Sequence, residues 1–242
     1  LQANATVLSI EPDRLTYPTL GESTKVVHAD PTAWDLGFDG SGWMVAVLDT
    51  GVDTTHAAFA GKTIVEACFS STFGYGGTNT VTACPNGQQT QFGPAAAAPP
   101  SVPGAGHGTH VAGIAVGNGG GVTGVAKDAD LIAVQVFSIV AGCTGGDCVT
   151  AWSSDILAAL DYVNDLTATY DVASANLSLG GGRYTGPCGT ETVIANLRSH
   201  GVATLAASGN DGWSDALAYP ACLAGAIAVG STDDGSIGTT LD

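Results

Sequence analysis

Five short apolar runs, with helical patterns between them, constrain the fold more than any other feature of the sequence. The runs show little alternation between apolar and polar residues, which is typical of strands buried on both faces of a sheet. They lie at 43–48, 131–137, 173–179, 202–207 and 226–230. Strands that alternate with helices predict a three-layer α/β/α domain with a mostly parallel central sheet. In such sheets, ligands bind at the carboxyl ends of the strands.

Two segments between these runs have the apolar spacing of amphipathic helices. The first is 153–166, and we expect Ser153 or Ser154 to cap its amino end. The second begins near Thr190, which is the expected cap, and is followed by Gly201. A glycine just past the last helical residue is a common helix terminator, because it tolerates the left-handed conformation.

Length and charge limit the number of domains and the class of partner. A chain of 242 residues suits one large α/β domain. Its 22 acidic and 6 basic residues give a formal net charge of −16, with an isoelectric point of about 4.2. Such a surface repels phosphate backbones and anionic lipid, so we expect neither nucleic acid nor a membrane as a partner. No apolar run reaches the ~18 residues needed to cross a bilayer.

Six cysteines, without CxxC or zinc-ligand spacing, predict disulfide bonds and an oxidising compartment. We therefore expect a secreted protein. We also expect a monomer. Nearness in the sequence favours three pairs, the alternative being that some cysteines are free, buried thiols: Cys68 with Cys84, Cys143 with Cys148, and Cys188 with Cys222. Residues 68–106 are rich in Gly, Pro, Thr and Asn, so we expect one long irregular excursion there.

The first apolar run leads directly into “LDTGVD”, which places Asp49 at its end. The carboxyl end of a buried parallel strand is where a catalytic or orienting carboxylate would stand, and Gly51 lets the chain turn away at once. A turn cap is the structural alternative for Asp49. The D-T-G motif also occurs in aspartic proteases, but these need two such carboxylates, and the chain has no second D-[ST]-G.

Two histidines lie three residues apart in “GHGTHVAG”. The glycines around His107 allow close backbone approach at the start of a helix, and His110 follows one turn later. The pair lacks the Glu of HExxH and a third ligand, so it does not predict a metal site. We expect His110 to be a hydrogen-bonded core residue.

Two further strand ends, in “SLGGG” and “AASGNDG”, are rich in glycine. A strand end without large side chains offers backbone donors and acceptors to an extended peptide. An Asn just past a strand can present its amide to a developing oxyanion. The GxGxxG match at 119–124 follows a helix and not a strand, so it does not indicate dinucleotide binding.

Taken together and in order, “VAVLDTGVD”, “GHGTHVAG”, “SLGG” and “AASGNDG” resemble the subtilisin-like serine proteases over nearly all of residues 40–235. The resemblance implies an endopeptidase that acts on polypeptides through an Asp/His/Ser triad. It implies that Asp49 is the orienting acid, His107 the general base and Asn210 the oxyanion-hole donor. It also implies two sets of substrate-binding residues: Ser178, Leu179 and Gly180 as the strand that pairs with the substrate backbone, and Ala207, Ser208 and Gly209 as a wall of the S1 pocket.

The sequence departs from the family pattern after Asn210, because the nucleophile motif G-T-S-x-A-x-P does not follow. Ser231 and Ser236 lack that context, and each fits a turn. We therefore expect a fold that is incomplete at its carboxyl end, with the nucleophile outside this chain and the fragment itself inactive. The alternative is a noncatalytic, peptide-binding pseudoprotease.

The same resemblance divides the chain into two parts. Residues 1–20 resemble the end of the family's inhibitory propeptide, with an ordinary N-terminal extension as the alternative. Residues 21–242 correspond to the catalytic domain without its nucleophile-bearing part. A calcium site of the family near “DTTHAAF” would need carboxylates where Ala57 and Ala58 stand, so we expect no metal there and no cofactor.

Overall fold

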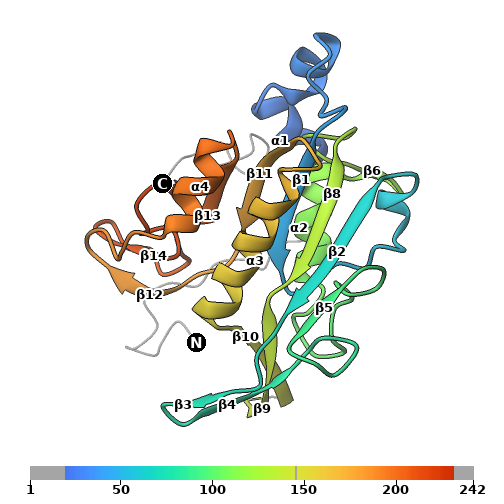
Figure 1. Ribbon diagram of the computed structural model, residues 1–242. Helices are drawn as coiled ribbons and strands as arrows, with labels where there is room; N and C mark the ends of the chain where they lie inside the picture. The colour runs from blue at the N-terminus through green and yellow to red at the C-terminus, as the bar shows by residue number, and fades with distance from the viewer. Residues whose placement is uncertain (1–19, 145, 232–242) are drawn as a thin grey trace, which may run out of the picture.

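The computed structural model describes residues 20–144 and 146–231, with a seven-stranded sheet at its centre (Figure 1). The strand order is β15-β13-β11-β1-β8-β2-β5. The strands are β1 (Met44–Asp49), β2 (Ile64–Phe69), β5 (Thr90–Phe92), β8 (Asp130–Gln135), β11 (Val172–Leu177), β13 (Ala203–Ala207) and β15 (Ile227–Val229). All neighbours are parallel except β2 and β5. The predicted parallel sheet is confirmed, and each predicted apolar run forms one of its strands.

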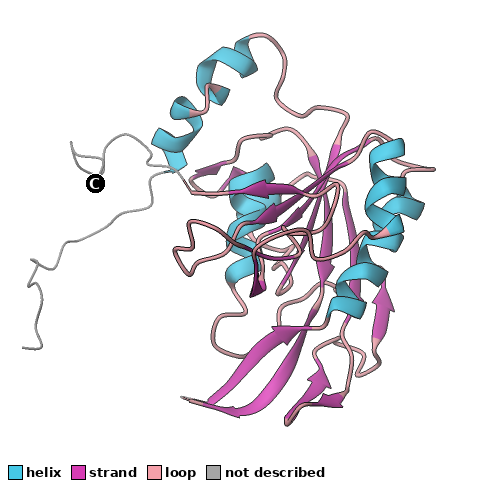
Figure 2. Ribbon diagram, turned by 90° about the vertical axis from the view of Figure 1, so that its left-hand side faces the viewer, coloured by secondary structure: helices cyan, strands magenta, loops and turns pink. Residues whose placement is uncertain are grey.

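Helices cover both faces of this sheet, which confirms the three-layer architecture (Figure 2). Helices α3 (Ser153–Leu166) and α4 (Thr192–Ser199) pack on the face that contains Ala46 and Leu48. Helix α2 (His107–Val116) packs on the other face, against Val45 and Val47. Because successive side chains of a strand point to opposite faces, β1 contributes to both cores and is fully buried.

The remaining elements are short. Helices α1 (Leu20–Val26) and η1 (Ala29–Ala33) precede the sheet, and η2 (Ala57–Phe59) follows β1. Three small sheets are built from β3 (Gly74–Tyr75), β4 (Thr78–Thr82), β6 (Asn118–Gly119), β7 (Val122–Thr123), β9 (Phe137–Cys143), β10 (Gly146–Ala151), β12 (Gly181–Tyr184) and β14 (Leu217–Tyr219). None of the helices in the described part of the chain is long and apolar enough to cross a bilayer. Residues 1–19 of the predicted propeptide remnant lie outside the described residues.

The predicted irregular excursion at 68–106 is wrong in part. Strand β4 pairs with β9 in a four-stranded antiparallel sheet of order β10-β9-β4-β3. Strand β5 returns to the central sheet and pairs antiparallel with β2. Strand β9 lies more than fifty residues after β4, so the composition of the excursion alone could not show this pairing.

The expected caps of α3 and α4 are also corrected. Trp152, and not a serine, occupies the N-cap of α3, because its backbone is still extended (φ −86°, ψ 140°) and Ser153 is the first helical residue. Its Nε1 donates to Thr80 Oγ1 at 2.9 Å. Glu191 takes the place expected for Thr190, and neither N-cap residue makes a side-chain capping bond.

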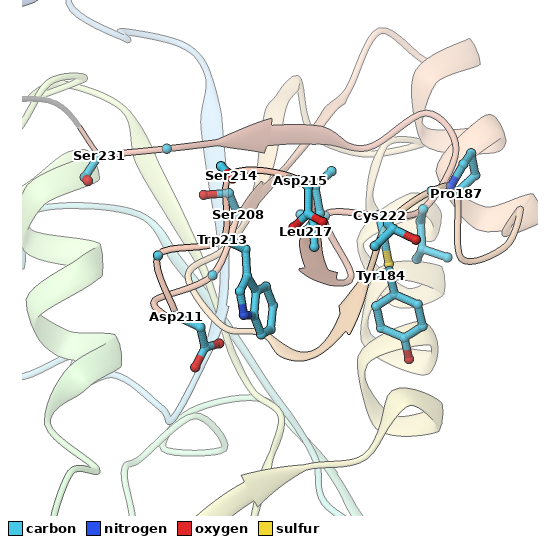
Figure 3. Close-up of a pocket in the computed structure, with 18 of the residues that line it drawn as sticks. Tyr184, Pro187, Ser208, Asp211, Trp213, Ser214, Asp215, Leu217, Cys222 and Ser231 are labelled. Atoms are coloured by element: carbon cyan, nitrogen blue, oxygen red, sulfur yellow. The ribbon is translucent and has the colours of Figure 1, made fainter.

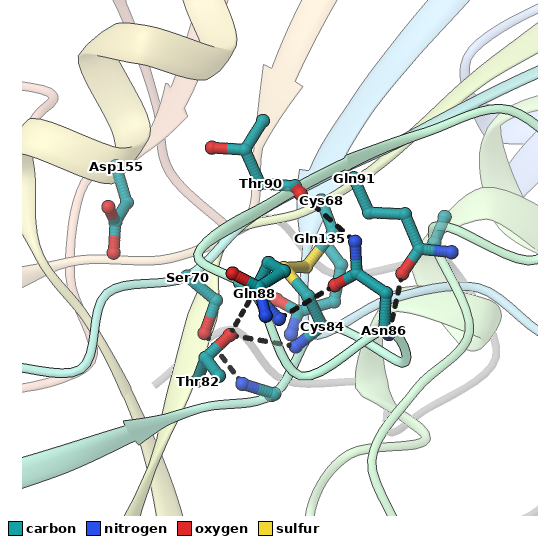
Figure 4. Close-up of a disulfide and its surroundings, with 12 residues drawn as sticks. Cys68, Ser70, Thr82, Cys84, Asn86, Gln88, Thr90, Gln91, Gln135 and Asp155 are labelled. Atoms are coloured by element: carbon teal, nitrogen blue, oxygen red, sulfur yellow. Dashed lines mark hydrogen bonds between the residues drawn. A yellow bond between two sulfur atoms is a disulfide. The ribbon is translucent and has the colours of Figure 1, made fainter.

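The three disulfide bonds and one helix terminator agree with the sequence predictions. All six cysteines are paired as expected: Cys68–Cys84, Cys143–Cys148 and Cys188–Cys222. The first closes the base of the excursion, where Thr82 Oγ1 donates to Gln88 O at 2.8 Å (Figure 4). Gly201 follows α4 with a φ of +82°, and its N–H donates to Arg198 O.

Candidate active site

The end of β1 and the start of α2 bring Asp49 and His107 together. Nδ1 of His107 lies 2.7 Å from Oδ1 of Asp49. The Asp49 side chain is fully buried, while 49% of the His107 side chain is exposed. Because a carboxylate can only accept, the Nδ1 atom carries the proton, and Nε2 of the neutral ring is left as the acceptor. This is the tautomer that a general base needs.

The electrostatics of the pair raise the proton affinity of His107. The hydrogen bond to Asp49 raises the pKa of His107 above its ordinary value, desolvation of the partly buried ring opposes this rise, and the charge of Asp49 adds to it. Asp49 Oδ2 is buried without a hydrogen-bond partner among the described residues. Because Asp49 raises the pKa of His107, the ring can accept a proton from a group that approaches its Nε2 atom.

Glycine is required where α2 approaches the turn after β1. A Cβ atom on Gly108 would lie 2.2 Å from Gly51 O and 3.0 Å from Oδ1 of Asp49. Gly51 itself has a φ of +102°, a conformation that L side chains rarely adopt. The expectation of close backbone approach around His107 is confirmed.

His110 is exposed, so the prediction that it is a core residue is wrong. The buried side of α2 includes Gly108, Ala112 and Val116, which recur every four residues. His110 lies two positions from both Gly108 and Ala112, so its side chain points to the opposite side of the helix.

A cleft of about 750 Å³, here called the His107 cleft, runs from His107 between two walls. One wall includes the predicted residues Ser178, Leu179 and Gly180, which follow β11. The other is the last part of β10, at 149–151, which the sequence analysis did not identify. The predicted Cys143–Cys148 pair around a Gly-Gly turn is the one sequence signal for the hairpin that builds this wall.

The residues after β13 lie beside this cleft. Ser208 and Gly209 line a second cleft of about 880 Å³, here called the Trp213 cleft (Figure 3). Ala207 is half-buried, and Asn210 is exposed. A Cβ on Gly180 would lie 3.0 Å from the Ala218 methyl group, and one on Gly209 would lie 3.4 Å from it. The ends of β11 and β13 are therefore neighbours across Ala218.

Neither a nucleophile nor a metal centre is assembled in residues 20–144 and 146–231. In these ranges no serine hydroxyl is hydrogen-bonded to His107. Ser231 is exposed and lines the Trp213 cleft, and Ser236 lies outside the described residues. No three His, Cys, Asp or Glu side chains of the described part gather as metal ligands would. That the chain uses no cofactor stays a prediction.

Comparison with known proteins identifies the family. The model of the subtilase family matches residues 40–239. The chain belongs to the subtilase family. Subtilisin from Bacillus sp. (strain TA39) is 35% identical over 204 residues, which are 81% of this chain and 40% of that protein. Subtilisin Savinase from Lederbergia lenta is 36% identical over 206 residues, or 84% of this chain and 60% of that protein.

Two further proteases extend the comparison. Minor extracellular protease Vpr from Bacillus subtilis (strain 168) is 30% identical over 226 residues, covering 89% of this chain and 23% of that protein. The solved structure described as proteases from Pseudoalteromonas arctica PAMC 21717 superimposes with a TM-score of 0.55 at 28% identity, over 84% of this chain and 60% of that one. The chain thus spans at most 60% of the length of these four proteins.

Proposed function

We propose that the chain is part of a secreted, monomeric serine endopeptidase of the subtilisin type. The observation that carries this proposal is the Asp49–His107 pair. A fully buried carboxylate holds Nδ1 of the imidazole at 2.7 Å, and the half-exposed ring lines a cleft. Membership of the subtilase family supports it, since the family model covers both residues.

Each residue has a physical role in this mechanism. His107 takes the proton of a serine hydroxyl as that oxygen attacks the scissile carbonyl, and later gives the proton to the leaving amine. Asp49 holds the ring in the required tautomer and stabilises the imidazolium. Asn210 donates to the oxyanion, and loss of such a donor costs roughly 100- to 1,000-fold in rate. The nucleophilic serine of this mechanism is not among the described residues, and we propose residues 1–20 as the propeptide remnant.

The substrate is an extended polypeptide. The segment 178–180 and the end of β10 both line the His107 cleft, where backbone groups of either segment could pair with an extended peptide. Small residues at 207–209 leave room beside them for a substrate side chain. The net charge of −16 disfavours nucleic acid and anionic membranes. Three disulfide bonds support secretion. No observation favours the peptide-binding pseudoprotease.

The test is to express the full reading frame that contains this chain, and to measure cleavage of a peptide substrate. We expect cleavage that falls about 10⁴-fold or more in kcat/KM on His107→Ala. The matched control is His110→Ala, because His110 lies exposed on the same helix. The proposal is wrong if the protein expressed from the full reading frame is inactive, or if the two histidine variants lose activity equally.

A further inference from the structure

Thr50 connects the two halves of the Asp49–His107 pair. Its side chain is buried, with 3% exposed. Oγ1 donates to Ala105 O at 2.8 Å and accepts from the Gly108 N–H at 3.0 Å. These two backbone groups lie on either side of His107, so one hydroxyl holds the turn that carries the imidazole.

Helix α2 depends on this hydroxyl because it has no cap of its own. The first N–H groups of a helix have no partner within the helix, and a side chain at the N-cap usually supplies one. The N-cap residue of α2 is Gly106, which has no side chain to do so. Thr50, 58 residues before Gly108, supplies the missing acceptor.

The main chain of the same residue holds the carboxylate. The Thr50 N–H donates to Asp49 Oδ1 at 2.7 Å, and this is the oxygen that binds His107 Nδ1. Thr50 therefore holds the acceptor, the Asp49 carboxylate, through its backbone N–H. It holds the segment that carries the donor, the His107 ring, through its side-chain hydroxyl. A second tie, from the Asp53 N–H to Thr109 Oγ1 at 2.8 Å, joins the same two segments nearer the surface.

We propose that Thr50 is a positioning residue that sets the distance between Asp49 and His107. It acts through the imidazole, so its catalytic meaning rests on the function proposed above. Without the hydroxyl, the Gly108 N–H and Ala105 O would be left unpaired in a buried site, and the first turn of α2 would move to find other partners. A small displacement of a catalytic group has large effects on rate.

A purely structural threonine would behave differently. Its removal would lower the free energy of unfolding but leave the Asp49–His107 hydrogen bond as it is. A positioning threonine changes that hydrogen bond, and Asp49 is the charged group that raises the pKa of His107. The pKa of His107 therefore separates the two roles, and it can be measured in this chain whether or not the protein cleaves peptides.

The experiment is an NMR pH titration of the histidines in the 242-residue chain, with His107 assigned from the His107→Ala variant. We expect Thr50→Val to lower the pKa of His107 by about half a unit or more, roughly a threefold change in its protonation equilibrium, and to shift the Nδ1–H resonance. Thr50→Ser keeps the hydroxyl and should restore the wild-type titration. His200, whose Nδ1 lies 3.1 Å from Asn164 Oδ1, reports in the same spectra on a distant part of the fold.

Thr204→Val is the matched control. Thr204 is also a buried threonine, with 3% exposed, but its Oγ1 has no hydrogen-bond partner among the described residues. This variant should leave the titration of His107 unchanged. If Thr50→Val does not fold, Thr50→Ala takes its place, since it puts no methyl group against the two backbone groups.

Three results would overturn the proposal. The first is an unchanged pKa and Nδ1–H resonance of His107 in folded Thr50→Val. The second is a Thr50→Ser variant that titrates like Thr50→Val. The third is unfolding of both Thr50→Val and Thr50→Ala, which would assign the hydroxyl to folding alone.

Discussion

At Gly51 and Gly108, beside Asp49 and His107, a single added methyl group would overlap backbone, whereas around Asn210 the chain is open to solvent. A Cβ on Gly108 would lie 2.2 Å from Gly51 O, but one on Gly212, two residues after Asn210, would meet nothing within 4 Å. Asn210 and Gly209 are both exposed. The first region is fixed by contacts within the described chain, and the second has few such constraints.

The position of each region in the sheet explains this difference. Strand β1, which carries Asp49, lies between β11 and β8 and is buried along its whole length. Strand β13, which leads to Asn210, is separated from the sheet edge only by β15. Ile227 and Val229 of β15 are 51% and 46% exposed. A site residue at the centre of a sheet thus has neighbours on every side, while one near the edge depends on fewer.

The largest effect should come from adding a methyl group to the constrained region. We expect Gly108→Ala to lower the free energy of unfolding by at least about 4 kcal/mol, because the Cβ atom overlaps the backbone at Gly51. Gly106→Ala is the matched control, since its Cβ would meet nothing within 4 Å. It should cost less than about 1 kcal/mol. Urea unfolding measures both, and equal costs would show that the region is not tightly constrained.

The open region should depend more on a covalent link. The Cys188–Cys222 disulfide joins residues 34 apart and spans the segment that contains Asn210. Replacing both cysteines by serine should cost about 3.8 kcal/mol, because the unfolded chain regains the entropy of a long loop. The Cys143–Cys148 bond spans only 5 residues, and its removal should cost about 2 kcal/mol. A larger loss for the short loop would contradict this account.

A smaller effect concerns the pH dependence of stability. The pKa of His107 is raised by Asp49 in the folded state, so the pair stabilises the fold below the unfolded pKa of about 6.5. This contribution is lost as the pH rises through the folded pKa. We expect Asp49→Asn to reduce the fall in urea midpoint between pH 5.5 and 8.5. An unaltered pH dependence in Asp49→Asn would show that the pair contributes nothing to stability.

The sequence by itself determined the parallel sheet, the three disulfide pairs and the motif around His107. These features have local signals: an unbroken apolar run for each buried strand, cysteines close in sequence, and glycines beside the histidine. The apposition of Asp49 and His107 was also within reach, because it follows from the resemblance to the subtilisin-like proteases.

Only the tertiary structure decided which distant groups meet. The pairing of β4 with β9, the β10 wall of the His107 cleft and the capping of α2 by Thr50 each join segments far apart in the chain. The exposure of His110 depended on which side of α2 faces the sheet. A hydrogen bond or a buried face needs a partner, and the sequence near a residue does not show which distant segment will supply it.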